Sequence, residues 1–189
     1  MTDQQPTPPP RPQKQKPGLV IINTGNGKGK TTAALGTALR HAGYGRKVLI
    51  LQFIKGTWHY GELESLKLIP QITLERSGMG FYKILDDKYP EELHKQAAAA
   101  GLERARGAVA SGEYSLVVLD EIIYAIGEGL LALADVVELL GRRKEDVSVI
   151  LTGRAAPQEL IDLADMVTEM REIKHPFQQG ILALKGIDY

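Results

Sequence analysis

The 189-residue sequence contains no cysteine, and this absence excludes several kinds of chemistry together. Structural disulfides, thiolate nucleophiles, cysteine-ligated zinc and iron–sulfur clusters all require that residue. The sequence also has no excess of either charge, because 23 Lys and Arg residues are balanced by 23 Asp and Glu residues. No overall basic field therefore indicates a nucleic-acid partner.

Long apolar runs are absent as well. No run approaches the roughly 20 residues of a membrane-spanning helix, and the N-terminus has no hydrophobic signal core. We therefore expect a cytoplasmic protein without a membrane partner. A chain of this length is expected to bury the core of a single domain without disulfides or metal ions.

Proline is concentrated at the N-terminus, where residues 1–17 hold six of the ten prolines and no large apolar residue beyond Met1. This composition predicts a disordered or polyproline-like arm. The arm could be a solvated tail, or, as a more specific alternative, a polyproline segment that binds a partner protein. Residues 18–189 are predicted to form the folded domain.

From residue 18 onward, short apolar runs alternate with longer stretches of helical periodicity. The predicted strands are 19–24, 48–54, 72–77, 116–121, 147–153 and 166–172, and the predicted helices are 32–41, 89–110, 131–140 and 157–164. Strands that are continuously apolar are buried on both faces, which is typical of a parallel sheet. The predicted fold class is therefore α/β, a doubly wound, mostly parallel sheet with helices on both faces. Ligands of such sheets bind at the carboxyl ends of the strands.

The segment TGNGKGKTT, residues 24–32, follows the first predicted strand and resembles a phosphate-binding loop with one irregularity. The pattern G-x-x-x-x-G-K-[ST] would place its first glycine at position 24, which is Thr24, and the glycine comes one residue later. The dinucleotide pattern G-x-G-x-x-G fails, because position 30 is a lysine. Glycines permit close approach of the backbone to phosphate, and the amides of the following helix face an anion.

Two side chains of this loop carry the expected chemistry. Lys30 adds a mobile positive charge, and Thr31 places a hydroxyl where a magnesium ion bridging phosphates could use it. The alternative is a glycine-rich turn between a strand and a helix, with incidental lysines.

Polar residues follow three further strands. Asp120 and Glu121 end the strand LVVLDE and could hold a metal ion, although two acids there can also mark a simple strand–helix boundary. Arg154 of LTGR could reach phosphate or ribose, or cap a surface turn. QFIKGTW offers Lys55 and Trp58, the latter of which could equally be core. The four histidines share no metal-ligand spacing. These residues indicate a magnesium-dependent nucleotide-binding protein, with a kinase, a motor-like ATPase or another activity left open.

A more specific indication comes from segments spread along the chain. In order, they are GNGKGKTTAALGTALRHAGYG, VLILQFIKGTWHYGE, GMGFYK, VVLDEI, LTGR and ADMVTEMREIKHPFQQGILALKGIDY. Together they resemble the P-loop corrinoid adenosyltransferases, which act on cobalamin and its precursors. The resemblance runs from about Gly18 to Tyr189, and the short spacing of the loop is itself part of that family's motif.

The resemblance implies a P-loop NTPase-like (RecA-like) fold and transfer of the 5′-deoxyadenosyl group of ATP to the cobalt(I) of a corrinoid, with release of inorganic triphosphate. It implies that the nucleotide lies in the loop in the reverse sense from ordinary P-loop proteins. It further implies Mg²⁺ (or Mn²⁺), a homodimer, and a flavoprotein that supplies the reducing electrons.

The resemblance also assigns site residues. It implies catalytic roles for Lys30, Thr31 and Glu121, and metal ligation by Thr31 and Glu121 with Asp120 beside them. ATP binding falls on Gly25, Asn26, Gly27, Lys28, Gly29, Lys30, Thr31, Thr32 and Arg154.

The corrinoid side of the resemblance is carried by GMGFYK. Phe81 and Tyr82 are the implied corrinoid-binding residues, and Lys83 stands where some members have a second aromatic residue. Some members also fold an N-terminal helix over the site, which a proline-rich arm cannot form because proline breaks helix interiors. Two alternatives from other classes are a nucleotide-binding regulatory module that uses the arm to hold a partner, and an ordinary P-loop ATPase or kinase.

Overall fold

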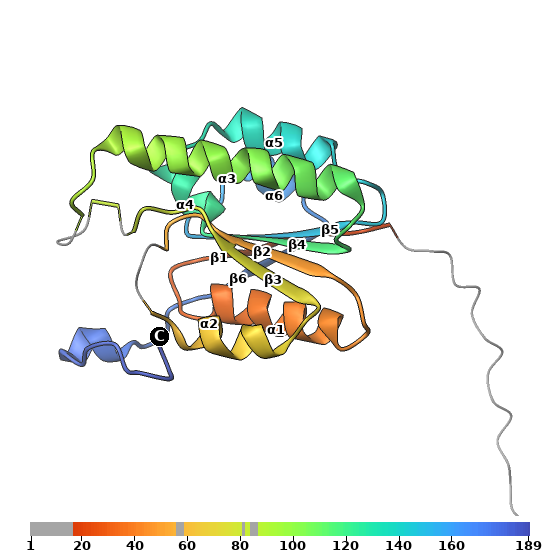
Figure 1. The fold of residues 1–189 in the computed structure, drawn as a ribbon. Coiled ribbons are helices and arrows are strands. Elements are labelled where there is room, and N and C mark those ends of the chain that lie inside the picture. The colour runs from red at the N-terminus through yellow and green to blue at the C-terminus, as the bar shows by residue number, and fades with distance from the viewer. Residues whose placement is uncertain (1–16, 56–58, 81, 84–86) are drawn as a thin grey trace, which may run out of the picture.

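The computed structural model describes residues 17–55, 59–80, 82–83 and 87–189, and it contains one six-stranded sheet (Figure 1). The strand order is β3-β2-β4-β5-β1-β6, and every pair of neighbours is parallel. The strands are β1 (Val20–Thr24), β2 (Val48–Gln52), β3 (Ile72–Arg76), β4 (Leu116–Asp120), β5 (Ser148–Thr152) and β6 (Met166–Glu169). The predicted α/β class with a parallel sheet is confirmed. The predicted arm falls almost wholly outside the described residues and stays a prediction.

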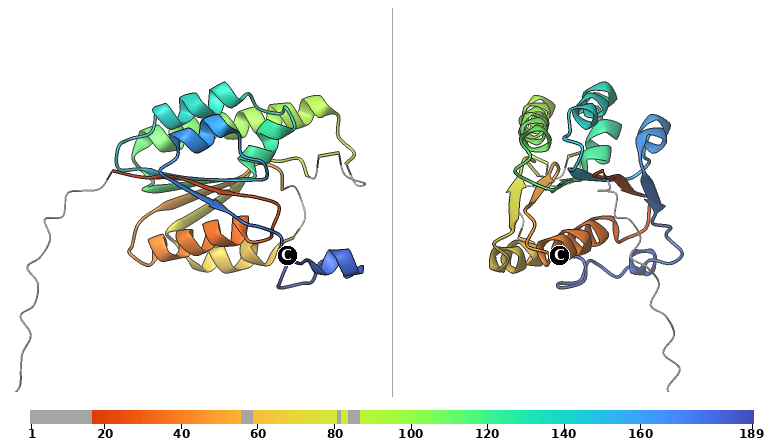
Figure 2. Two further views of the ribbon diagram at one scale, coloured as in Figure 1. Left: turned by 180° about the vertical axis from the view of Figure 1, so that it is seen from behind. Right: turned by 90° about the vertical axis from the view of Figure 1, so that its right-hand side faces the viewer.

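Helices cover both faces of this sheet, as predicted (Figures 1 and 2). One face carries α1 (Lys30–Ala42) and α2 (Gly61–Ser65), and the other carries α3 (Glu91–Ser111), α4 (Ile122–Gly127), α5 (Leu133–Gly141) and α6 (Gln158–Leu163). Two short 3₁₀ helices, η1 (Leu66–Leu68) and η2 (Pro176–Gln179), complete the elements. Within the described ranges, no helix is both long and apolar enough to cross a bilayer.

The core lies in two layers because successive strand residues point to opposite faces of the sheet. Leu49 and Leu51 of β2 pack under the helices α3 to α6. Val48 and Ile50 of the same strand pack instead against the alanine face of α1. Every residue of β2 and β4 is buried, which accounts for the continuous apolar runs that predicted these strands.

The sequence did not predict α2 and α4, since both are short. Only Glu121 separates the end of β4 from the start of α4, so the short apolar stretch of this helix follows closely on the strand. The predicted last strand is shorter than expected and ends at Glu169, where the chain turns beneath the loop that follows β1. Because the strands are parallel, the carboxyl ends of β1, β2, β4 and β5 lie along one edge of the sheet.

A pH-dependent contact ties α1 to the amino end of β4. His41 Nε2 lies 2.8 Å from Ser115 Oγ, and burial, with a smaller contribution from Arg46, lowers the pKa of His41. The unfolded chain therefore binds the proton more readily, so stability falls as pH drops below the usual histidine range. Urea unfolding at pH 5 and pH 7 is expected to show a larger loss for the wild type than for His41→Gln. Equal losses would contradict this assignment.

Candidate functional site

The loop between β1 and α1 owes its shape to glycines packed against the chain that leaves β6. Gly25 has a φ of 96° and Gly29, which caps α1, has a φ of 119°; L-residues rarely adopt such values. A Cβ on Gly25 would lie 2.5 Å from Met170 O, and one on Gly27 would lie 2.7 Å from the same oxygen. The Gly27 amide donates to that oxygen over 2.6 Å. Glycine is therefore required at Gly25 and Gly29 because of their positive φ values. At Gly25 and Gly27 it is required because a side chain would collide with Met170.

Thr24, at the position of the missing first glycine, serves a different purpose. It is the last residue of β1 and has no positive φ, so no glycine is needed there. Its hydroxyl accepts a hydrogen bond from the Ala156 amide over 3.1 Å, and its carbonyl accepts one from the Met170 amide over 2.7 Å. Thr24 thus ties the loop after β5 to the loop after β1.

Restoring the usual glycine at this position is expected to weaken the protein. Thr24→Gly removes the acceptor for the Ala156 amide and loosens the end of a strand, at a cost of about 1–2 kcal/mol. Thr24→Ser keeps the hydroxyl and is the control, with an expected change below about 0.5 kcal/mol. Urea unfolding measures both. A Thr24→Gly variant as stable as the wild type would show that the hydroxyl is not an anchor.

Lys30 places its ammonium group inside the loop. The residue is only 7% exposed, and Nζ donates to Gly25 O over 2.7 Å and to Gly27 O over 2.8 Å. Burial lowers the pKa of Lys30, and the nearby Glu121 carboxylate partly opposes that shift. The loop therefore concentrates one buried cation among backbone groups, which is the arrangement that a bound polyphosphate requires.

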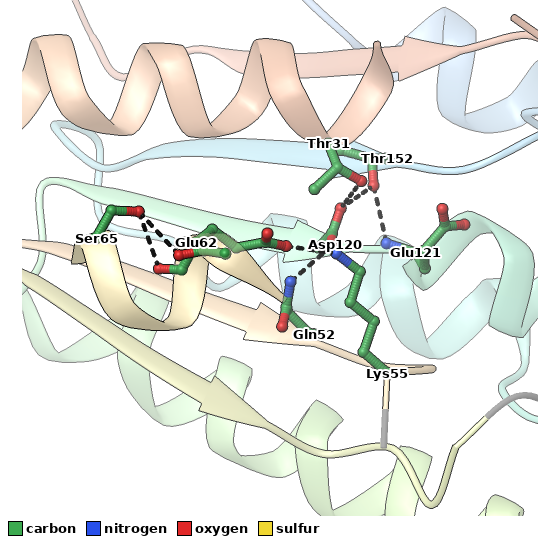
Figure 3. A network of polar contacts seen from close by, with 9 residues as sticks. Thr31, Gln52, Lys55, Glu62, Ser65, Asp120, Glu121 and Thr152 are labelled. Atoms are coloured by element: carbon green, nitrogen blue, oxygen red, sulfur yellow. Dashed lines mark hydrogen bonds and ion pairs between the residues drawn. The ribbon is translucent and has the colours of Figure 1, made fainter. Parts of the chain in front are cut away.

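Asp120, at the end of β4, has polar contacts to both of its carboxylate oxygens (Figure 3). It is 1% exposed. Its Oδ1 accepts hydrogen bonds from Thr31 Oγ1 and Thr152 Oγ1, both over 2.8 Å. Its Oδ2 accepts one from Gln52 Nε2 over 3.2 Å and lies 3.8 Å from Lys55 Nζ. Because both oxygens are occupied, the geometry makes Asp120 a group that orients the Thr31 hydroxyl.

Glu121 differs from its neighbour in having an unpaired carboxylate. Its backbone is left-handed, with φ 62°, and its amide donates to Thr152 Oγ1 over 2.8 Å. Within the described residues no hydrogen bond or ion pair to its carboxylate is present. Burial raises the pKa of Glu121, and the Asp120 charge adds to that shift. Strained backbone and an unsatisfied carboxylate are features of residues that bind a ligand.

Two cavities meet at the loop. One, of about 500 Å³, is lined by Thr31, Thr32, Lys55 and Glu121 among others. The second, of about 440 Å³, is lined by Asn26, Gly27, Arg154 and His175 among others. Lys28, Lys30 and Asp188 line both cavities. The structure therefore brings the loop residues from Asn26 to Thr32, Glu121 and the exposed Arg154 around two adjoining cavities.

A family model for ATP:corrinoid adenosyltransferase BtuR/CobO/CobP matches residues 16–189. The chain belongs to the ATP:corrinoid adenosyltransferase family. The predicted family and enzyme class are thereby confirmed, and family membership implies ATP and a corrinoid as the two substrates.

Similar proteins with the same name agree with this membership. The chain is similar to the corrinoid adenosyltransferase of Escherichia coli K12, with 40% identity over 176 residues that cover 91% of this chain and 86% of the relative. Corrinoid adenosyltransferase CobA of Salmonella typhimurium is 39% identical, with the same coverage. A corrinoid adenosyltransferase of Pseudomonas aeruginosa is 36% identical over 91% of this chain and 84% of the relative.

Tyr82, one of the two residues implied for corrinoid binding in this adenosyltransferase, does not line the cavities at the loop. Phe81 lies outside the described residues, as does Trp58. Tyr82 is 2% exposed, packs 5.0 Å from the His94 ring and lines neither cavity. Lys83 has a φ of 59°, and its Nζ pairs with Glu128 Oε2 over 3.2 Å and lies 4.6 Å from the centre of the Tyr82 ring. The lysine of this adenosyltransferase is therefore turned toward α4.

Several adenosyltransferase site residues were missing from the sequence prediction. Gln52 and Thr152 are the last residues of β2 and β5, and both contact Asp120. The sequence could have identified both as candidate site residues, since each is a polar residue at the end of an apolar strand. Glu62 had no such signal: it pairs with Lys55 over 2.9 Å because α2, itself unpredicted, folds over the rim of the sheet.

Proposed function

We propose that this corrinoid adenosyltransferase joins the cobalt(I) of a corrinoid to the 5′ carbon of ATP and releases inorganic triphosphate. In this step the electron pair of cobalt(I) forms the cobalt–carbon bond. The carbon–oxygen bond at C5′ breaks, and its electron pair leaves with the triphosphate. Family membership over residues 16–189 is the observation that carries this reaction. The nucleophile belongs to the substrate, so the protein needs none of its own.

The loop is the proposed holder of the leaving group. Negative charge grows on the triphosphate oxygen as the bond to carbon breaks, and groups that stabilise this charge more than bound ATP lower the barrier. The buried ammonium of Lys30 and the amides at the start of α1 are suited to that role. Asn26, Lys28, Thr32 and Arg154, which line the two cavities, are the proposed remaining ATP contacts.

A divalent cation, Mg²⁺ or Mn²⁺, is the proposed partner of the triphosphate. The donor set fits, because the Thr31 hydroxyl and the unpaired Glu121 carboxylate offer hard oxygen ligands, with Asp120 orienting Thr31. Among the described residues no three His, Asp or Glu side chains form a metal cluster, so phosphate or water oxygens would have to complete the shell. When bound, the cation would neutralise charge on the triphosphate.

The corrinoid is proposed to approach this edge of the sheet, and Phe81 and Tyr82 are its proposed contacts on the family resemblance. Lys83 replaces a second aromatic residue there, and its pairing with Glu128 supports a structural role for this cation. A flavoprotein is the proposed source of electrons for cobalt(I). A chemical reductant can replace the flavoprotein in an assay, so the adenosyl transfer can be tested separately from the source of the electrons.

A homodimer is proposed on the family resemblance and on the exposed apolar side chains of the last part of the chain. These include Met166, Val167, Ile173, Phe177, Ile181, Leu182, Leu184 and Ile187. Side chains of this kind in one segment are typical of an interface. Sedimentation equilibrium is expected to give twice the 20.7 kDa chain mass. A single-chain mass at micromolar concentration would contradict the proposal.

The reaction is tested by incubating the protein with ATP, Mg²⁺ and chemically reduced corrinoids that range from cobalamin to earlier ring intermediates. A light-sensitive adenosylated product is expected, and the relative rates identify the preferred corrinoid. An ATP-binding regulatory module would give no product, and an ATPase or kinase would release ADP.

Removal of residues 1–17 is expected to leave turnover intact, since the arm is proposed to be a solvated tail.

A further inference from the structure

The segment Leu184–Tyr189 folds back on itself as a compact turn. The Asp188 amide donates to Leu184 O over 2.8 Å, and Asp188 Oδ2 accepts from the Leu184 amide over the same distance. Gly186 has a φ of 80° and donates to Tyr189 O over 2.7 Å. One oxygen of the Asp188 carboxylate is thus used to hold the turn together, which fixes where the other oxygen points.

That second oxygen is directed at the phosphate loop. Asp188 Oδ1 lies 2.9 Å from Lys28 Nζ, and the two side chains are 26% and 43% exposed. The Leu184 amide first, and Lys28 second, lower the pKa of Asp188, so the carboxylate is ionised at neutral pH. The turn lies on the face of the sheet that carries α1 (Figures 1 and 2).

Lys28 and Lys30 are therefore in different electrostatic situations. Lys30 donates to two neutral carbonyl oxygens of its own loop. Lys28 is paired with a full negative charge supplied from 160 residues further along the chain. Both lysines and Asp188 line both cavities, so an anion bound to Lys28 in either cavity lies beside this carboxylate. Asp188 and a polyphosphate carry the same sign, so they compete for Lys28.

We propose that Asp188 sets the affinity of the site for triphosphate-bearing ligands by competing with them for Lys28; the proposal rests on the proposed function for the identity of the anion. The competition weakens binding of ATP and of the triphosphate product alike. Its benefit lies with the product, because triphosphate gains an additional negatively charged oxygen when the carbon–oxygen bond breaks and is then held more tightly by Lys28. Asp188 returns to Lys28 as triphosphate departs, so the cation is never left without a counter-charge.

Isothermal titration of inorganic triphosphate into Asp188→Asn tests this competition. Asparagine keeps an oxygen that can accept from the Leu184 amide, and it loses the charge that faces Lys28. The dissociation constant is expected to fall about fivefold, as removal of a half-exposed competing charge would give, and the gain should shrink in high salt. Asp162→Asn, which removes the same charge from α6, is the matched control and should leave binding unchanged.

A double-mutant cycle with Lys28→Gln makes the test specific. In the Lys28→Gln background, Asp188→Asn is expected to have no further effect on triphosphate binding. Weaker binding by Asp188→Asn would show that the carboxylate orients Lys28 for phosphate, and unchanged binding would show that it is a bystander; either result overturns the proposal. Triphosphate binding does not depend on adenosyl transfer. The proposed reaction could therefore fail while this inference stands, and the reverse also holds.

Discussion

Replacing Lys30 by methionine is expected to lower kcat by about 10²–10³-fold, the loss typical of removing one preorganised charge-stabilising donor. The reason is the position of its ammonium, which is buried at the centre of the loop and already oriented by Gly25 O and Gly27 O. Its benefit grows as charge develops on the departing triphosphate, so kcat should fall more than the KM for ATP rises. Methionine preserves the length of the side chain, and circular dichroism should show a retained fold.

Lys28→Met is the matched control for this experiment. Both residues are lysines of the same loop, but their surroundings differ. Lys28 is partly exposed and forms an ion pair with Asp188, whereas Lys30 is buried and donates to backbone carbonyl oxygens of the loop. The Lys28 variant is expected to lose far less than the Lys30 variant, about tenfold or below. Equal losses, or a Lys30→Met enzyme with most of its kcat, would show that the buried cation is not the stabilising group.

Substituting alanine for glycine at two positions is expected to change stability in opposite directions. At Gly25 the backbone has φ 96° and the new Cβ would lie 2.5 Å from Met170 O, so Gly25→Ala should cost roughly 2–4 kcal/mol. At Gly36, inside α1, a Cβ would meet no atom within 4 Å, and Gly36→Ala should stabilise by about 0.5–1 kcal/mol. Urea unfolding of the two variants gives both values.

The Gly25→Ala variant is also expected to bind inorganic triphosphate at least about tenfold more weakly, because a displaced loop no longer aims its amides at one point. Gly36→Ala should bind triphosphate as the wild type does. A stable Gly25→Ala protein with normal triphosphate affinity would contradict the assignment of this loop as a rigid phosphate cradle.

Much of the fold follows from local sequence patterns. The runs at β1, β2, β4 and β5 are apolar because both faces of each strand are buried, so they predicted a parallel sheet without any knowledge of the strand order. The loop residues and Asp120 were found for a related reason. They follow strand ends, and parallel strands bring those ends to one edge.

The remaining features depend on contacts between distant parts of the chain. Thr24 looked like a defect in a phosphate-loop motif, and only its bond to the Ala156 amide explains the residue. Asp120 and Glu121 were both predicted at the end of one strand, and the structure gives them different surroundings. Asp120 accepts hydrogen bonds on both carboxylate oxygens, whereas within the described residues the Glu121 carboxylate has no such bond. Lys28 was predicted only as an ATP-binding residue, and its ion pair with Asp188 joins two residues that are 160 positions apart in the sequence. No local pattern encodes such contacts.

The most direct test of the central claim is to identify the phosphorus product of a single turnover. With cobalt(I) corrinoid, Mg²⁺ and limiting ATP, ³¹P NMR should show inorganic triphosphate, in amounts equal to the light-sensitive adenosylated corrinoid measured by absorbance. That result requires cleavage between C5′ and oxygen, so that the whole triphosphate is the leaving group. ADP and inorganic phosphate, or triphosphate without adenosylated corrinoid, would contradict the account.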